Sequence, residues 1–254
     1  MLTSMDNLLN MLAKLATSTR IYATKNQALL LSVGAVGCMV VRRRLKTSPP
    51  GTGNDKPPSS SDKERKKSML YTRTGDKGES SLYNGERRSK TDPVFEALGE
   101  QDELCAAIGI AREYCAIGRN NLSPMLIEIQ SRLFDLGAAV ATPRNTSSVD
   151  KIVYTAFNPK HTEQLELWID TLDAEMPPLT TFIIPSGGLS STHLHMARVV
   201  CRRAERAVVP LIADMQIDVE VGRYLNRLSD LLFAAARVAA QREQREEIEW
   251  RKAA

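Results

Sequence analysis

Residues 191–212 read STHLHMARVVCRRAERAVVPLI, and residues 217–245 read IDVEVGRYLNRLSDLLFAAARVAAQREQR. Apolar residues recur in both stretches every three or four positions, which is the spacing of one face of an α-helix. Pro210 stands near the end of the first stretch, where a helix is expected to stop. The two stretches therefore predict two long helices joined by a short connection.

Three more helices are predicted upstream. One opens at Pro93 behind the N-cap Asp92, one runs from Pro124 toward Pro143, and one covers residues 165–172. Their apolar positions, which we expect in the core, are Val94, Leu98, Leu104, Ile108, Ala111, Leu126, Ile129, Leu133, Leu136, Val140, Leu165, Leu167, Trp168 and Leu172. No segment alternates with period two long enough to suggest a sheet. The expected fold is an all-α, five-helix antiparallel bundle.

Positive charge is concentrated near the N-terminus. Residues 1–70 carry 12 Lys and Arg against 4 Asp and Glu, whereas the rest of the chain carries 22 against 26. The predicted bundle is therefore mildly acidic, which argues against a broad nucleic-acid-binding surface. The four cysteines form no CxxC pair, so neither a zinc knuckle nor a disulfide framework is expected.

The N-terminal arm has the composition of a targeting segment. Residues 1–46 contain one acidic residue and several arginines, which predicts a mitochondrial transit segment and location in the matrix. The apolar run 28–41 is shorter than the ~20 residues of a membrane-spanning helix, so no stable membrane insertion is expected. A secretory segment and a short membrane anchor are the alternatives. Residues 47–69 are predicted to be a disordered linker, 70–245 the helical domain and 246–254 a C-terminal tail.

The first segment with chemical potential is residues 72–81, TRTGDKGESS. Its glycines let the backbone curl, and a curled backbone directs N–H groups inward, which suits a phosphate. Lys77 and, further on, Arg87, Arg88 and Lys90 could add positive charge. Taken alone, the segment fits an ordinary surface turn better, because Gly, Ser and Asp clusters usually form loops.

The second segment is the row Arg198, Arg202 and Arg206, whose members are four residues apart and share one helix face over about 12 Å. Arg203 and Glu205 flank the row. Four arginines beside one glutamate need a polyanion, or acids from another helix or subunit, to offset their repulsion. A triphosphate suits them because guanidinium groups fork onto phosphate oxygens, and Glu205 could hold the accompanying Mg²⁺. A salt-bridged helix face is an equal alternative.

Asn226 and Phe182 could each have a functional role, but their own sequence context does not require one. Asn226 and Asp230 are four residues apart on one predicted helix, where Asn226 could contact an adenine or a ribose; a polar network inside the bundle is the simpler interpretation. Phe182 lies in a short apolar strip, residues 179–185, and by itself predicts a core aromatic. His193 and His195 cannot share a helical face, so no histidine metal site is expected.

Together these segments resemble the PduO-type ATP:cob(I)alamin adenosyltransferase family, in its mitochondrial animal branch. The matching stretches are YTRTGDKGESSLYNGERRSKTDPVFEALGEQDEL, PPLTTFIIPSGG, CRRAERAVVPL and YLNRLSDLLF, in the family's order from Tyr71 to Ala240. The combination of TRTGDxG, RxxxRRxER and NRLSD is highly specific. The resemblance implies a ferritin-like five-helix bundle that forms a homotrimer with active sites between subunits.

The resemblance also implies residue roles. The ATP-binding residues would be Thr72, Arg73, Thr74, Gly75, Ser80, Ser81 and Lys90 from one subunit, and Arg202, Arg203, Ala204, Glu205, Arg206 and Asn226 from its neighbour. Among these, Arg202, Glu205 and Arg206 would be catalytic, with Glu205 near Mg²⁺. Arg198 would pair with Asp102 across the interface, and Phe182 would lie against the corrin and block the lower face of cobalt.

The implied reaction moves the 5′-deoxyadenosyl group of ATP onto cob(I)alamin and releases triphosphate. The resemblance further implies delivery of adenosylcobalamin to methylmalonyl-CoA mutase and a cobalamin reductase as a second partner. Three alternatives stay open at this point. They are a cobalamin carrier without transfer activity, a nucleotide-binding bundle without transfer activity, and a membrane-tethered structural protein that uses residues 28–41.

Overall fold

The computed structural model describes residues 73–253. The predicted transit segment, the linker and Thr72 lie outside the described residues. The chain divides into two compact units after Gly78. In the first unit, the described residues 73–78 form a turn in which Gly78 N–H donates to the carbonyl oxygen of Gly75 at 3.2 Å. The second unit begins at Glu79 and holds every helix and strand described below.

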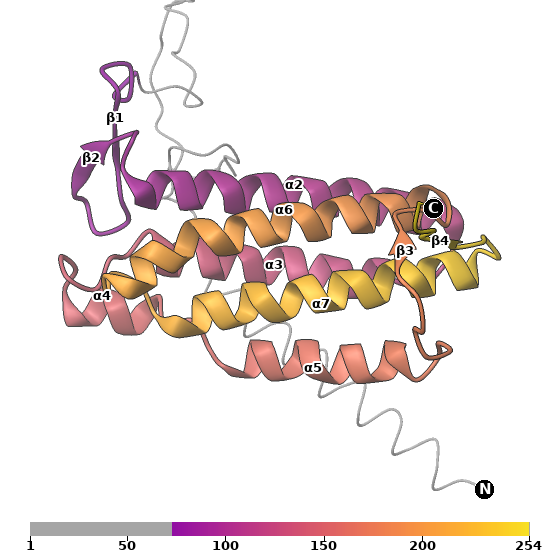
Figure 1. Ribbon diagram of the computed structural model, residues 1–254. Helices are drawn as coiled ribbons and strands as arrows, with labels where there is room; N and C mark the ends of the chain where they lie inside the picture. The colour runs from indigo at the N-terminus through magenta and orange to yellow at the C-terminus, as the bar shows by residue number, and fades with distance from the viewer. Residues whose placement is uncertain (1–72, 254) are drawn as a thin grey trace, which may run out of the picture. The chain divides into compact units, whose positions relative to one another are not determined.

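Six helices make up the second unit (Figure 1). They are α2 (Pro93–Gly118), α3 (Ser123–Val140), α4 (Val149–Tyr154), α5 (Lys160–Asp173), α6 (Gly188–Ala213) and α7 (Val219–Arg242). Helix α6 packs between α2 and α7, α3 packs on α2, and α5 packs on α7. The five long helices match the five that the apolar spacing predicts. The short helix α4, of six residues, is not predicted.

The helix ends follow local chemistry. The Asp92 carboxylate accepts from Val94 N–H at 2.9 Å and Pro93 occupies the first turn, so the predicted N-cap of α2 is confirmed. Asp218 caps α7 in the same way through Glu220 N–H at 3.1 Å. Helix α6 begins after a left-handed Gly187 with φ 87°, where an added Cβ would lie 2.5 Å from that of Ala240. Only glycine fits there, because α7 passes so closely.

The core consists of the predicted apolar faces. Leu104 and Ile108 of α2, Ile129 and Leu133 of α3, and Leu194 of α6 are fully buried. Burying each such side chain contributes about 2 kcal/mol to folding. Leu167 is the exception among the expected core positions, since 60% of it is exposed on α5. Helix α5 is amphipathic with a narrow apolar face, and Leu167 falls outside that face.

Two small antiparallel sheets complete the unit. Strands β1 (Glu79–Ser81) and β2 (Arg87–Ser89) form a hairpin, although the sequence predicts no sheet. Strands β3 (Ile183–Ile184) and β4 (Ile248–Glu249) pair the strip before α6 with the C-terminal tail. Within residues 73–253, no helix combines the length and the apolar character needed to cross a bilayer.

Candidate active site

The arginine row predicted from the sequence runs along the solvent-facing side of α6. Arg202 and Arg206 are exposed, and the Arg206 guanidinium donates to the carbonyl oxygen of Arg202 at 3.1 Å. Among residues 73–253, no carboxylate forms an ion pair with either guanidinium or with Arg198. Three like charges at helical spacing repel one another, so this face favours binding an anion from outside the chain.

Arg198 differs from the other two because it is partly buried. Its Nε is buried without a hydrogen-bond partner in the described chain, and its guanidinium carbon lies 5.8 Å from the centre of the Phe233 ring. Burial, and then the charge of Arg202, lower the pKa of Arg198. The predicted partner Asp102 lies on α2 and forms no ion pair with Arg198 inside this chain. The predicted contact across a subunit interface stays a prediction.

Arg203 points to a different neighbour. Its guanidinium pairs with the Glu100 carboxylate at 2.5 Å and also with that of Glu103, both on α2. These hydrogen bonds raise the pKa of Arg203. Ala204 is buried in the core, so it offers no side chain to a ligand. Of the RRAER stretch, Arg202, Glu205 and Arg206 remain directed away from α2 and the core.

Glu205 and Asn226 meet across α6 and α7. The Asn226 side-chain amide donates to the Glu205 carboxylate at 2.8 Å, which joins two residues that the sequence separates by 21 positions. The described residues contain no cluster of three or more His, Cys, Asp or Glu that could enclose a metal ion. A single oriented carboxylate nonetheless fits Mg²⁺, which commonly takes one or two carboxylates and completes its shell with phosphate and water.

A cleft of about 350 Å³ opens beside the arginine row between α5, α6 and α7. Its lining residues are Ile169, Asp173, Arg198, Arg202, Ser229, Asp230, Phe233 and Ala234. The cleft thus brings two predicted arginines together with the serine and aspartate of the NRLSD stretch. Its mixture of apolar and charged walls suits a ligand with both a flat apolar part and an anionic part.

Three of the residues predicted to bind ATP from the neighbouring subunit, Ser80, Ser81 and Lys90, lie on or directly after the hairpin strands. Ser80 is buried in β1, while the exposed Ser81 hydroxyl accepts from Arg87 at 3.5 Å. Lys90 directly follows β2 and is exposed. Arg73, Thr74 and Gly75 belong to the first unit, and Arg73 adopts a left-handed φ of 60°.

Phe182 lies at the edge formed by β3 and β4, not in the core that its sequence context predicts. Phe182 is 77% exposed, and its ring meets that of Trp250 edge-on, with ring centres 6.3 Å apart. The backbone N–H of Trp250 donates to the backbone carbonyl oxygen of Phe182 at 2.7 Å. An exposed aromatic pair of this kind offers an apolar wall to a partner or ligand.

Three residues of this region were missed by the sequence analysis: Trp250, Phe233 and Asp173. Trp250 carried a readable signal, because a large aromatic in the charged tail EEIEWRKAA has no core to join locally. Phe233 and Asp173 carried none, since helical spacing alone does not tell which face will border a cleft.

Comparison with known proteins agrees with this arrangement. Residues 70–239 match the family model of cobalamin adenosyltransferase. The corrinoid adenosyltransferase MMAB of Bos taurus is 45% identical over 83% of this chain and 90% of its own length. The MMAB of Homo sapiens is 44% identical, over 83% of this chain and 86% of its own length.

Solved structures give the same result. A variant of the PduO-type ATP:corrinoid adenosyltransferase from Lactobacillus reuteri, complexed with cobalamin and ATP, superimposes with a TM-score of 0.67 at 36% identity. The match covers 72% of this chain and 99% of that structure. A second variant of that protein, complexed with ATP, has a TM-score of 0.65 at 38% identity, over 71% of this chain and 99% of its own. With both its fold and its matched length in agreement, this chain belongs to the cobalamin adenosyltransferase family.

Proposed function

We propose that this protein transfers the 5′-deoxyadenosyl group of ATP to cob(I)alamin, producing adenosylcobalamin and triphosphate. The observation that carries the proposal is the row Arg198, Arg202 and Arg206, which lacks carboxylate partners within the described chain. Two of its members, Arg198 and Arg202, line a cleft. A variant of one related enzyme with this fold has been solved with cobalamin and ATP. A triphosphate would supply the negative charge that the row lacks.

The reaction requires little covalent chemistry from the protein. The electron pair of Co(I) forms a bond to the 5′ carbon, and the bond from that carbon to the triphosphate oxygen breaks with its electron pair. Negative charge therefore grows on the leaving group. Fixed guanidinium groups of Arg202 and Arg206 would stabilise that charge, and the protein's main task is to position the reactants.

Glu205 is the residue proposed to hold Mg²⁺. The metal would neutralise part of the triphosphate charge when ATP is bound. The hydrogen bond from Asn226 fixes the orientation of the Glu205 carboxylate, as outer contacts do for metal ligands in general. Asn226 is also proposed to contact the nucleoside of ATP.

Phe182 is proposed to lie against the corrin on the lower side of cobalt. An apolar ring there provides no ligand to the metal, so it favours a Co(II) centre without a lower ligand, which is easier to reduce to Co(I). The 77% exposure of the ring in the isolated chain supports this role, since an aromatic side chain of a folded protein is normally covered.

We further propose that the protein works as a homotrimer with shared active sites. The Tyr114 and His193 rings of α2 and α6 lie with their centres 4.4 Å apart, and the same two helices carry exposed apolar residues. They are Ile110 and Ile117 on α2, and Leu189, Met196 and Val199 on α6, each more than half exposed. Covering this face with a second subunit would also let Asp102 reach the buried, unpaired Nε of Arg198.

The cellular setting is proposed from the sequence and the relatives. The basic, acid-poor residues 1–46 support import into the mitochondrial matrix. Adenosylcobalamin made there would be delivered to methylmalonyl-CoA mutase, and a cobalamin reductase would supply the electron for Co(II). A direct binding measurement with each purified partner would test these two interactions.

The central experiment incubates the purified protein with ATP, Mg²⁺ and chemically reduced cobalamin. We expect the Co(I) absorbance to disappear with one triphosphate released for each adenosylcobalamin formed. A pure nucleotide-binding bundle would bind ATP without releasing triphosphate, and a pure carrier would bind adenosylcobalamin without consuming ATP. Either result from a folded protein would refute the proposal.

A further inference from the structure

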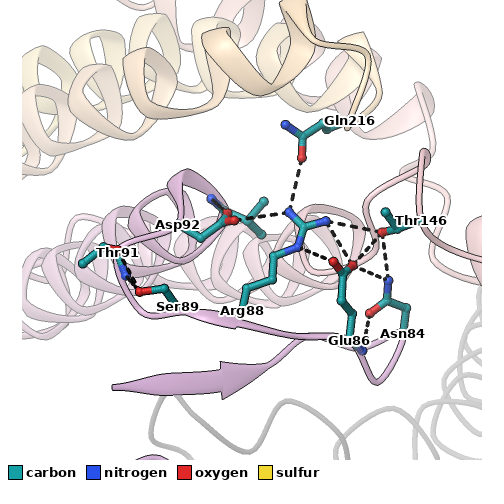
Figure 2. Close-up of polar contacts among 9 residues, drawn as sticks. Asn84, Glu86, Arg88, Ser89, Thr91, Asp92, Thr146 and Gln216 are labelled. Carbon is teal, nitrogen blue, oxygen red and sulfur yellow. Dashed lines mark hydrogen bonds and ion pairs between the residues drawn. The ribbon is translucent and has the colours of Figure 1, made fainter. Parts of the chain in front are cut away.

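One guanidinium, that of Arg88, ties the β1–β2 hairpin to the helices. Figure 2 shows it at the centre of a network drawn from four separate segments. Its Nε and one Nη donate to the two Glu86 carboxylate oxygens at 2.9 and 3.0 Å, in the forked geometry that arginine forms with carboxylates. The same side chain reaches the Thr146 hydroxyl at 3.3 Å and the Gln216 side-chain carbonyl at 3.4 Å.

This network joins the hairpin to the start of α2, which follows it directly, and to two loops that are far away in the sequence. Asp92 is the N-cap of α2, Thr146 lies in the loop after α3, and Gln216 lies in the turn between α6 and α7. The Arg88 side chain is only 13% exposed, although the strand that carries it lies at the surface. A charge that is buried to this degree destabilises the protein unless its hydrogen-bond partners are in place. Moving the hairpin would break these hydrogen bonds, so the network favours one position of the hairpin.

The partners of Arg88 are themselves held. The Thr146 hydroxyl donates to Glu86 at 2.7 Å, and the Asn84 side-chain amide reaches both of these residues at 3.2 and 3.3 Å. The hydrogen bonds from Arg88, and then from Thr146, lower the pKa of Glu86 to about 2, so this carboxylate is ionised at neutral pH. The network therefore has few alternative arrangements.

The hairpin also carries residues to which we assign ATP contacts. Ser80 is the cross-strand partner of Arg88, Ser81 follows on the same strand, and Lys90 comes two residues after Arg88. Asp92 caps α2, but no residue of the network belongs to the apolar core that stabilises the helices. Displacement of the hairpin by about 1 Å would instead move these three side chains together relative to a bound nucleotide.

We propose that Arg88 is a positioning residue for ATP: it fixes the hairpin against the α2 N-terminus, the loop after α3 and the α6–α7 turn, and thereby fixes Ser80, Ser81 and Lys90. The inference rests on the proposed ATP contacts of these three residues. Lysine cannot replace arginine in this role, because one ammonium group cannot fork onto Glu86 and reach Thr146 and Gln216 at the same time.

The test compares Arg88→Lys with Arg223→Lys in the full-length protein. Arg223 is an exposed arginine on α7 that pairs with Glu220 within the helix, so it controls for the loss of a guanidinium. We expect Arg88→Lys to raise the KM for ATP about tenfold, because the hairpin is misplaced, while kcat and the KM for cobalamin change less than about twofold. Arg223→Lys should change none of them.

Two further variants separate this inference from the proposed site. Lys90→Ala should raise the KM for ATP by itself, and adding Arg88→Lys to it should raise the KM by less than the product of the two single effects. Gln216→Leu removes one hydrogen-bond partner of Arg88 without altering charge, and it should raise the KM for ATP by itself. The inference can therefore be tested even if Arg88→Lys folds poorly.

The outcomes are distinct. If Lys90→Ala weakens ATP binding but Arg88→Lys and Gln216→Leu leave the KM for ATP unchanged, the positioning role is wrong and the site stands. A uniform loss of kcat and of both affinities would show general loosening of the fold and would also overturn the inference. Absence of triphosphate release from the wild-type protein would instead refute the proposed reaction.

Discussion

At the scale of single residues, the contrast between Arg202 and Arg203 is informative. The two are neighbours on α6, yet Arg203 forms ion pairs with Glu100 and Glu103 while Arg202 pairs with no carboxylate in residues 73–253. One arginine therefore connects α6 to α2, and the next is available to a ligand. The row has the expected spacing, but the sequence alone does not tell that the flanking Arg203 is paired with acids of α2 while Arg202 is not.

Arg202→Ala should accordingly impair chemistry and spare the fold. Loss of one group that stabilises leaving-group charge is expected to slow turnover about 100-fold. The helical content should not change, because the side chain is exposed and supports no intrachain ion pair. The measurements are the rate of Co(I) loss and far-ultraviolet circular dichroism, with Arg223→Ala as the matched control. Turnover near the wild-type rate would remove Arg202 from the catalytic set.

His195 predicts how stability depends on pH. It is buried, its Nδ1 has no hydrogen-bond partner in the described chain, and burial, followed by the charge of Arg198, lowers its pKa to about 4. The unfolded chain takes up this proton near pH 6.5 and the folded chain only near pH 4. The unfolded state therefore gains protons first as pH falls, and stability is lost between these two values.

His195→Leu should remove that loss. In the wild-type protein, this histidine should lower the free energy of unfolding by about 2 kcal/mol between pH 7.5 and pH 5. The variant replaces an unsatisfied polar atom by an apolar one, so it should be at least as stable at pH 7.5 and less sensitive to acid. Urea unfolding at both pH values, at one protein concentration, measures the difference. An equal loss of unfolding free energy between pH 7.5 and pH 5 in the two proteins would contradict the assigned pKa.

At the scale of elements, the long helices could be predicted and the small ones could not. The faces of α2 and α3 are marked by buried apolar residues at helical spacing, with a cap at Asp92. Helix α4 buries no residue, and its Val149, Val153 and Tyr154 are exposed, so it leaves no periodic signal. Strands β3 and β4 have two residues each, and their pairing depends on a contact across about 65 positions of sequence.

In the candidate site, too, features that lie within one long helix could be predicted, and features formed by two elements could not. The arginine row was visible because one helix holds all of it, and the helical period alone places its members on one face. The Glu205–Asn226 bond, the cleft and the Phe182–Trp250 pair each need two elements to meet. Their residues could be named from the family resemblance, but their mutual contacts depend on how the helices pack, which local sequence does not determine.

The β3–β4 edge predicts a shared role for Phe182 and Trp250. Phe182→Ala should slow adenosylation most when enzyme-bound Co(II) must be reduced, and least when Co(I) is supplied ready-made. Trp250→Ala should act in the same direction by about fivefold, the effect of losing an aromatic pair worth about 1 kcal/mol. In the double variant the two effects should not add, because Trp250 acts through the Phe182 ring.

The measurement is the rate of adenosylcobalamin formation from each cobalt state, with Val153→Ala on the exposed face of α4 as the control. Additive effects would mean that the two rings act separately. Equal slowing with Co(II) and with Co(I) would mean that the edge supports the fold or ATP binding instead of the cobalt coordination state.

At the scale of the whole molecule, the isolated chain has features that a partner would complete. Arg198 keeps a buried Nε without a hydrogen bond, and the α2–α6 face around Tyr114 and His193 exposes apolar side chains. A trimer with active sites between subunits would satisfy both, because it would cover the apolar face and bring an acid toward Arg198. Such a site would take its hairpin residues from one subunit and its α6 residues from the next.

Mixed trimers test this division of the site. Arg202→Ala damages the α6 side and Lys90→Ala damages the hairpin side, so each variant alone should be slow at limiting ATP. A trimer that contains both variants has two copies of one and one copy of the other, so about a third of its sites would combine an intact hairpin with an intact α6 from the neighbour. Co-expression with two affinity tags and sequential purification isolates these trimers, and the rate per site at limiting ATP should recover to about that fraction of the wild-type value. If both halves of the site came from the same chain, every site in the mixture would carry one defect, and the activity would stay at the level of the separate variants.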